Sequence, residues 1–189
     1  IQFTLDSLLG RVDQICMADN KWIGMEGKLN NSDDGTTQAI IDWSHKHPTM
    51  RINLFLLHAP MHQVQVRNFL LSRIPEEDWI LSIDSDEIVT NWLDIRAILE
   101  KAEVKGFRIN GYGGKPLSTF RLLKKTKGLH YTRNHRYVDD AEGKLFTQEF
   151  SVLPIQIEHH PLAIKKAMRK KMEEYKKNLW KWENAEKTM

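Results

Sequence analysis

One segment of the sequence limits the fold more than any other, because an apolar run leads directly into a group of carboxylates. Residues 79–90 read WILSIDSDEIVT, so Asp84, Asp86 and Glu87 follow a stretch with the character of a buried strand. In open α/β sheets, ligands bind at the edge where the strands end. The alternative is an acidic turn that faces water, but such a turn needs no buried strand before it. The segment therefore favours a ligand site.

The carboxylates also indicate which ligand this site binds. Three neighbouring carboxylates repel one another, and a cation relieves that repulsion. Hard oxygen ligands in this number suit Mg²⁺ or Mn²⁺, which commonly bridge one or two carboxylates to substrate phosphates. The sequence therefore predicts a divalent cation at residues 84–87.

The first half of the chain alternates helices and strands. The expected helices cover residues 2–10, 36–45 and 63–73, and the expected strands cover residues 12–19, 52–57 and 79–83. Thr36 is expected to cap the second of these helices. The strands are apolar on both faces, which is typical of a parallel sheet covered by helices. We therefore expect an α/β fold with a mostly parallel, Rossmann-like sheet flanked by helices.

The second half is rich in expected β-strands and ends in a basic helix. The strands are expected at residues 107–112, 119–123, 129–138 and 145–157. Residues 162–182 combine an apolar stripe with a Lys/Arg face, which predicts a basic amphipathic helix. We expect one domain over residues 1–160 and this helix within residues 161–189, packed on the domain or docked on a membrane surface. Nucleic acid is not an expected partner, because no motif that reads it is present.

Size and composition exclude several classes of protein. The chain has 189 residues, which suits one domain with its own core. No apolar stretch approaches the roughly 20 residues that span a bilayer. The single Cys16 cannot form an internal disulfide, so we expect a reducing compartment, the cytoplasm. The net charge of +3 hides a balance of −7 over residues 1–100 and +10 over residues 101–189. That asymmetry indicates an anionic partner for the basic half.

An ordered series of segments resembles the family 2 glycosyltransferases of the GT-A fold. The family's helix and second strand are matched by LDSLLGRVDQICMADN, and its Asp-Gly-Thr segment by SDDGTTQAIIDW. Its Arg-Asn helix, the next strand and the Asp-x-Asp-Glu metal site are matched by VRNFLLSRIPEEDWILSIDSDEIV. Its later strand pair is matched by FRLLKKTKGLHYTRNHRYV. The likeness covers most of residues 2–138, and the family's first nucleotide-binding strand has no counterpart here.

The resemblance implies a metal-dependent transferase. Asp84 and Asp86 would lie at the metal and the diphosphate of a nucleotide-sugar donor, with Asp86 as the expected direct ligand and His135 as a further metal or phosphate contact. The expected cation is Mn²⁺ or Mg²⁺, which would neutralise the charge that develops on the departing diphosphate.

Further residues are expected around the donor nucleotide. The resemblance places Asp19 at the nucleoside, Arg67 on the Arg-Asn helix beside the site, and His159 or His160 near the nucleotide. Charge-assisted hydrogen bonds to the diphosphate are expected from one or more of four basic side chains, Arg121, Lys124, Lys125 or Arg133.

An inverting transfer also needs a carboxylate that takes the proton of the acceptor hydroxyl. Four candidates remain open, namely Glu87, Asp139, Asp140 and Glu149. The acceptor is a saccharide, a lipid-linked molecule or a protein. The competing hypothesis is a non-catalytic module with a degenerate transferase fold, which would bind a polyanion, a membrane surface or a protein partner through the basic half.

Overall fold

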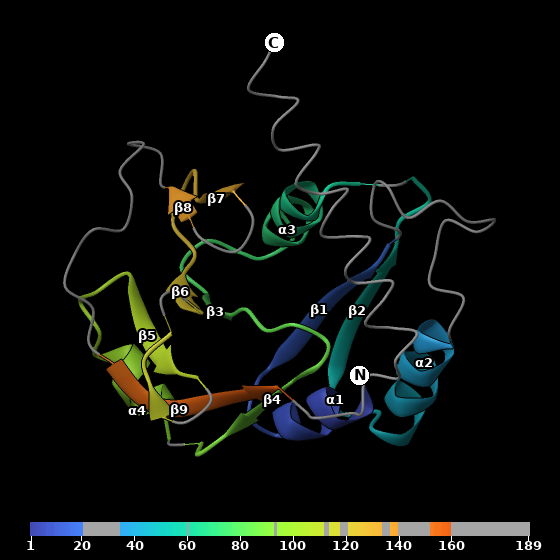
Figure 1. Ribbon diagram of the computed structural model, residues 1–189, viewed down its shortest axis with the longest axis horizontal. Helices are drawn as coiled ribbons and strands as arrows, with labels where there is room; N and C mark the ends of the chain where they lie inside the picture. The colour runs from blue at the N-terminus through green and yellow to red at the C-terminus, as the bar shows by residue number, and fades with distance from the viewer. Residues whose placement is uncertain are drawn as a thin grey trace, which may run out of the picture.

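The computed structural model describes residues 1–20, 35–59, 61–92, 94–111, 114–117, 121–133, 137–139 and 152–159. Helices and strands alternate at first, and strands dominate afterwards (Figure 1). In chain order the elements are α1 (Gln2–Leu8), β1 (Gln14–Asp19), α2 (Thr36–Lys46), β2 (Arg51–Leu56), α3 (Gln63–Leu71), β3 (Trp79–Leu81), β4 (Glu87–Thr90), α4 (Arg96–Glu100), β5 (Gly106–Asn110), β6 (Leu122–Lys124), β7 (His130–Arg133), β8 (Tyr137–Asp139) and β9 (Val152–His159).

The described strands form three sheets. β1 and β2 make a parallel pair whose register runs from Gln14 opposite Arg51 to Asp19 opposite Leu56. The largest sheet has five strands in the order β3-β6-β5-β9-β4. β7 and β8 make a small antiparallel pair. An α/β architecture is therefore confirmed, with the β-rich character of the second half.

The expectation of a mostly parallel sheet is wrong for the described residues. Within the five-stranded sheet only β5 and β9 are parallel, whereas β3–β6, β5–β6 and β4–β9 are antiparallel. The reason lies in the connections. Parallel neighbours need a crossover of about a dozen or more residues, usually a helix. Among the described residues no helix lies between β5 and β6, and the second strand returns antiparallel.

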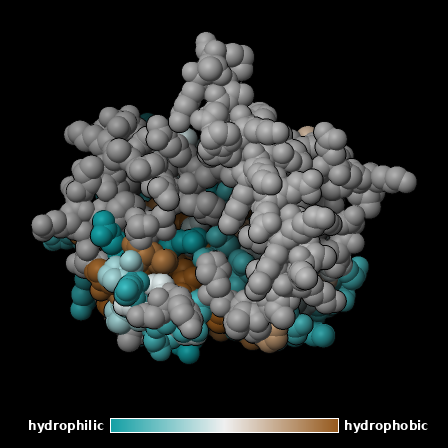
Figure 2. Space-filling view, in the orientation of Figure 1, coloured by the Kyte–Doolittle hydropathy of each residue, from teal (hydrophilic) through white to brown (hydrophobic). Residues whose placement is uncertain are grey.

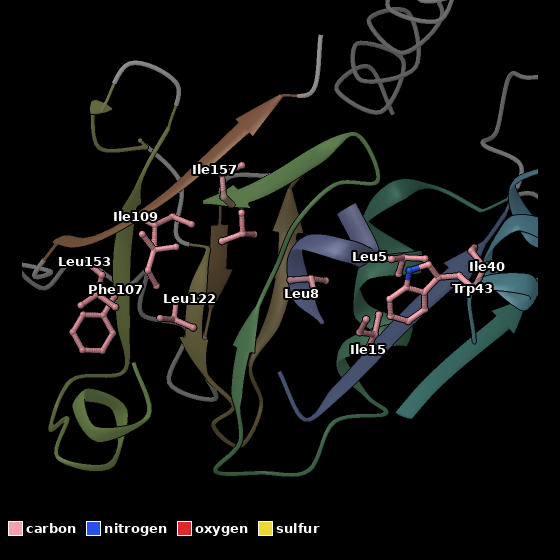
Figure 3. Close-up of a cluster of buried hydrophobic side chains, with 12 residues drawn as sticks. Leu5, Leu8, Ile15, Ile40, Trp43, Phe107, Ile109, Leu122, Leu153 and Ile157 are labelled. Atoms are coloured by element: carbon pink, nitrogen blue, oxygen red, sulfur yellow. The ribbon is translucent and has the colours of Figure 1, made fainter. Parts of the chain in front are cut away.

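One hydrophobic core joins the two larger sheets. One buried cluster contains Leu5 and Leu8 of α1, Ile15 of β1, Val89 of β4 and Ile155 of β9, and α1 packs against β4. Figure 3 shows this cluster running from the aromatic ring of Trp43 to that of Phe107. In the view of Figure 2, hydrophobic residues also reach the surface in the area of β5 and β9. Helix α1 is therefore the element that connects the parallel pair to the mixed sheet.

A second, smaller core lies under α3. Leu71 of this helix packs with Leu123 of β6 and with Leu129 and Tyr131 at β7. α3 also packs against β1. It thereby joins the parallel pair to the strands that follow, and it carries the first arginine of the site described below.

Several local predictions differ from the structure. The residue that precedes α2 as its N-cap is Gly35, which adopts a left-handed φ of 84°, so the prediction that Thr36 caps this helix is wrong. Glycine adopts this conformation without the steric penalty of a Cβ. Residues 129–138, expected as one strand, contain β7 and β8 paired antiparallel. The strand β4, which begins at Glu87, was not predicted at all.

Two predictions about the end of the chain are not tested. The basic helix of residues 162–182 lies outside the described residues, and so does the boundary at residue 160. Among the described helices, none is long and apolar enough to cross a membrane.

Candidate functional site

The carboxylates singled out by the sequence lie in a tight turn between β3 and β4. We call residues 84–87 the acidic turn. The backbone N–H of Glu87 donates to the carbonyl oxygen of Asp84 at 3.0 Å. In the other direction, the Asp84 N–H donates to Oε2 of Glu87 at 2.6 Å. The last residue of the turn therefore closes it with both its backbone and its side chain.

Arg67 reaches the acidic turn from α3. Its Nη2 lies 2.7 Å from Oδ1 of Asp84, and its Nη1 donates to the hydroxyl of Ser82 at 3.0 Å. The helix that carries it begins with a capping box, in which His62 accepts from the backbone at its ring and Gln65 accepts from the His62 N–H. This cap fixes the start of α3 one turn before Arg67. The arginine is thus held on a well-anchored helix, and its side chain is largely buried.

Arg121 reaches the same turn from the residue before β6. Its Nη2 lies 2.8 Å from Oε1 of Glu87 and 3.7 Å from Oδ2 of Asp84. Its backbone carbonyl accepts from the Ser82 N–H at 2.7 Å, which keeps the start of β6 beside the end of β3. The Glu87 side chain is only 2% exposed and that of Arg121 12% exposed. The pair is therefore buried, and buried charges are stable only when they are paired and hydrogen-bonded.

The charges of this cluster balance. Asp84 and Glu87 carry two negative charges, and Arg67 and Arg121 carry two positive ones. The mutual repulsion that the sequence led us to expect is thus relieved by two guanidinium groups. A metal is not required to hold these two carboxylates together. Asp86, by contrast, is exposed in the middle of the turn.

The neighbouring residue of α3 ties the site to β7. The Asn68 amide donates to the carbonyl oxygen of Tyr131 at 2.9 Å, and its Oδ1 accepts from the Tyr131 N–H at 2.7 Å. The guanidinium carbon of Arg67 lies 5.7 Å from the centre of the Tyr131 ring. These contacts fix the position of α3 relative to β7. They thereby hold Arg67 where its side chain reaches Asp84.

Asp19 lies at the carboxyl end of β1, as the sequence predicted. Its side chain is buried, and the hydroxyl of Thr37 donates to its Oδ2. Its carbonyl oxygen accepts from the Leu57 N–H at 3.1 Å, which continues the parallel pairing with β2. The carboxylate is therefore held against the first turn of α2. A carboxylate at a helix N-terminus is favourable because the helix dipole is positive there.

The strand register brings a further predicted position, residue 159, to the acidic turn. His159, the last residue of β9, is the Cα partner of Glu87 at the start of β4. These positions are far apart in the sequence but adjacent in the sheet. Arg133 ends β7 and Asp139 ends β8. The predicted residues His135, Asp140, Glu149 and His160 lie outside the described residues.

Lys124 forms an ion pair beside the start of β3. Its Nζ lies 2.7 Å from Oε2 of Glu77, which precedes β3. Nearby, the Lys125 N–H donates to the carbonyl oxygen of Asp78. Both residues follow Arg121 along β6, but the ion pair of Lys124 is formed at the opposite end of β3 from the acidic turn.

The fit of a divalent cation to these residues is limited. Within the part of the chain that the structure describes, no three His, Cys, Asp or Glu side chains are grouped so that they could hold a metal ion. Both carboxylates that flank Asp86 are bound to arginine. Asp86 is the exposed carboxylate of the turn. A cation held by one or two carboxylates completes its coordination with water and phosphate oxygens, as Mg²⁺ commonly does.

Sequence reasoning missed four residues that build the site, namely Thr4, Ser82, Asn68 and Tyr131. Ser82 lies two residues before Asp84, and a serine at such a position does not by itself predict a contact with Arg67. Asn68 follows Arg67 in the Arg-Asn pair, and its amide could have been expected to bind backbone. Thr4 donates to the carbonyl oxygen of Ser85 from a helix at the other end of the sequence, and no local pattern indicates that contact.

No protein-family model matches this chain, and a search of curated proteins found no match to it.

Proposed function

We propose that the protein is a metal-dependent, GT-A-like glycosyltransferase that moves a sugar from a nucleotide diphosphate-sugar to an acceptor hydroxyl. The observation that carries this proposal is the acidic turn at the end of β3, in which arginine holds Asp84 and Glu87 while Asp86 is exposed. The resemblance to family 2 glycosyltransferases is carried by residues 5–20, 32–43, 66–89 and 120–138. The GT-A assignment and the family rest on that resemblance.

Asp86 is the proposed ligand of Mn²⁺ or Mg²⁺. When bound, the cation supplies charge neutralisation for the departing diphosphate. Asp84 has a different role in this proposal, because its two oxygens face Arg67 and Arg121 at 2.7 and 3.7 Å. It fixes the turn from which Asp86 projects. His135 stays a proposed further contact of the metal or phosphate.

The nucleotide is proposed to lie across the ends of β1 and β3. Asp19 is the proposed nucleoside contact at the end of β1, and position 159 stands beside the acidic turn through its pairing with Glu87. Arg67 and Arg121 already bind carboxylates. Arg133 is therefore the arginine proposed to contact the diphosphate directly. The two buried arginines instead hold the turn in place through Asp84 and Glu87.

The general base is proposed to be Asp139, Asp140 or Glu149. A base must come within hydrogen-bonding distance of the acceptor hydroxyl. Glu87 is 2% exposed, and its two oxygens already accept from Arg121 and from the Asp84 N–H. It therefore holds the turn, and the proposal removes it from the candidates for the base.

The proposed acceptor is a saccharide, a lipid-linked molecule or a protein, and the transfer is proposed to invert the anomeric centre. The proposed compartment is the cytoplasm, which is consistent with the free thiol of Cys16.

The test is calorimetric titration of the full chain with UDP and GDP, with and without Mn²⁺. We expect one nucleotide to bind at least about tenfold more tightly with Mn²⁺, because Asp86 would hold a cation that neutralises the charge of the phosphates. Asp86→Asn should abolish this enhancement. Asp94→Asn is the matched control, since Asp94 is also an exposed aspartate but lies outside the turn. The proposal fails if neither nucleotide binds, or if Asp86→Asn behaves as the parent does.

One observation favours a second function. The balanced charges of Asp84, Glu87, Arg67 and Arg121 can serve structure alone, because they need no cation. In that case the domain would be a non-catalytic binding module for a polyanion, a membrane surface or a protein partner. Binding of a polyanion that weakens steeply with salt, together with no nucleotide binding, would support this second function.

A further inference from the structure

Strand β2 has one paired edge and one open edge. Just past its end, the Leu57 N–H donates to the carbonyl oxygen of Asp19 on β1 at 3.1 Å. Alternate residues of a strand point their N–H and C=O groups to opposite neighbours. Because residue 57 bonds to β1, the backbone groups of Ile52, Leu54 and Leu56 point away from β1. Among the described residues, no strand and no backbone hydrogen bond occupies that outer edge.

This outer edge lacks the features that usually protect an edge strand. Natural edges are blunted by charges, proline, bulges, short length or a covering helix. β2 runs over six residues with Arg51 as its only charge, and Leu56 at its end is 40% exposed. The edge strand β4 differs, because α1 packs against it and the Ser7 hydroxyl accepts from the Val89 N–H. β2 lies on the side of β1 away from the five-stranded sheet (Figure 1). Its outer edge is therefore suited to pair with an added strand.

The side chains beside this edge are basic. Arg51 and Phe55 lie on the same face of β2, because they are four residues apart in a strand. The Phe55 ring contacts that of Phe69 from α3 edge to face. The guanidinium carbon of Arg73 lies 4.7 Å from the centre of the Phe69 ring and 5.8 Å from that of Phe55. Both arginines are exposed, and neither forms an ion pair with a described carboxylate. Two guanidinium groups thus lie along one face of β2, at positions 51 and 55.

We propose that the outer edge of β2 binds an extended acidic segment of a partner protein. The segment adds to β2 as a strand and places one carboxylate opposite Arg51 and another opposite Phe55, beside Arg73. The positions opposite 51 and 55 are four residues apart on one face of the added strand. The partner is therefore identified by two acidic residues at i and i+4 in an extended, otherwise uncharged segment. This inference is independent of the proposed enzymatic activity.

The probe is the peptide TEVTVEVT, whose two glutamates lie on one face of a strand. TEVTEVVT has the same composition but places them on opposite faces, so it is the matched control. Fluorescence anisotropy of the labelled peptides measures their affinity for the full chain. We expect TEVTVEVT to bind at least about fivefold more tightly, because only this peptide can place a carboxylate at both arginines. About 1 M salt should reduce the difference.

Variants of the chain test the side-chain and backbone contacts separately. Arg51→Gln and Arg73→Gln should each weaken binding of TEVTVEVT up to about fivefold. Lys101→Gln removes an exposed charge at the end of α4 and should leave the affinity unchanged. Leu56→Pro removes an outward-facing donor without breaking the pairing with β1. It should weaken binding about fivefold relative to Leu56→Ala, which keeps that donor. Circular dichroism checks that each variant is folded.

Methylated peptides test the backbone pairing without any change in the protein. N-methylation of one alternate set of amides in TEVTVEVT should abolish binding, because those amides face β2, and N-methylation of the other set should not. Equal binding of the two methylated peptides would overturn the proposal. So would equal binding of TEVTVEVT and TEVTEVVT, or no binding of TEVTVEVT at about 1 mM. If sedimentation shows that the parent chain is a dimer and that Leu56→Pro dissociates it, a second copy occupies the edge and the proposal is likewise wrong.

Discussion

Nη2 of Arg121 and Oε1 of Glu87 lie 2.8 Å apart in the interior, where the glutamate side chain is 2% exposed. The second carboxylate oxygen of Glu87 accepts from the Asp84 N–H. The Glu87 side chain thus binds Arg121, which precedes β6, and at the same time closes the acidic turn. If either partner is removed, the other is left as a buried charge.

The first prediction concerns the loss of this carboxylate. Glu87→Ala should lower the free energy of unfolding by about 3–5 kcal/mol, because it leaves Arg121 buried without its main partner. Urea denaturation followed by circular dichroism measures the change. Glu87→Gln keeps an acceptor for the Asp84 N–H, so it should destabilise the protein less.

A double-mutant cycle is the control for that prediction. If the two side chains interact, Glu87→Ala combined with Arg121→Ala should cost less than the sum of the two single changes. A cost below about 1 kcal/mol for Glu87→Ala, the size expected of a solvent-exposed ion pair, would contradict a buried role.

The second prediction separates the two aspartates of the turn. Asp84→Asn should destabilise the protein, because Arg67 loses a charged partner at 2.7 Å. Asp86→Asn changes an exposed residue, so the melting temperature should stay close to that of the parent. Thermal denaturation without metal measures both. A larger loss of stability from Asp86→Asn than from Asp84→Asn would contradict the different roles that we assign to them.

Local patterns predicted much of the first half of the fold. The apolar runs at β1, β2 and β3 and the amphipathic α3 were all located to within a few residues. Strand direction in the second half was not predicted, because it depends on which strands pair. β4 is an example, since its partner β9 lies more than sixty residues later in the chain. No periodicity within residues 87–90 could have indicated that pairing.

The same distinction applies to the site. The carboxylates were visible because an apolar strand leads into them. Their partners were not, because Arg67 and Arg121 come from separate elements and converge on Asp84 only in the folded chain. From the sequence, the relief of repulsion between the carboxylates was therefore assigned to a cation. In the structure, Arg67 and Arg121 relieve it for Asp84 and Glu87. Residue types and spacing show which charges are present but not how they are paired.

The third prediction concerns the attachment of α3 to β7. Asn68→Ala removes two hydrogen bonds and leaves the N–H and carbonyl oxygen of Tyr131 without these partners. We expect the free energy of unfolding to fall by about 1–3 kcal/mol, the cost of unsatisfied polar groups. Gln65→Ala is a control on the same helix, since it removes only the side-chain half of the cap at His62. If the two variants are equally stable, the Asn68 contacts contribute no more to the free energy of unfolding than the exposed helix cap at His62 does.

The last prediction concerns pH and the ion pair that joins the start of β1 to α4. Arg96 donates from Nη1 and Nη2 to the two carboxylate oxygens of Asp13 at 3.1 and 2.8 Å. The hydrogen bonds from Arg96 are the main reason why the pKa of Asp13 is lowered below its ordinary value, with a smaller contribution from the positive charge of Arg96. Burial of the carboxyl acts in the opposite direction.

A lowered pKa in the folded state means that the ionised form of Asp13 stabilises the fold. This contribution is complete above the unfolded pKa, about 3.9 for an aspartate, and is lost as the pH falls through the lower folded value. Arg96→Gln should therefore raise the pKa of Asp13 in an NMR titration. It should also lower the melting temperature at pH 6, and this difference should shrink below about pH 4 as Asp13 becomes protonated in both proteins. A difference that stays constant over this range would exclude a role for the Asp13 charge. Because both side chains are exposed, about 1 M salt should reduce the difference at pH 6 as well.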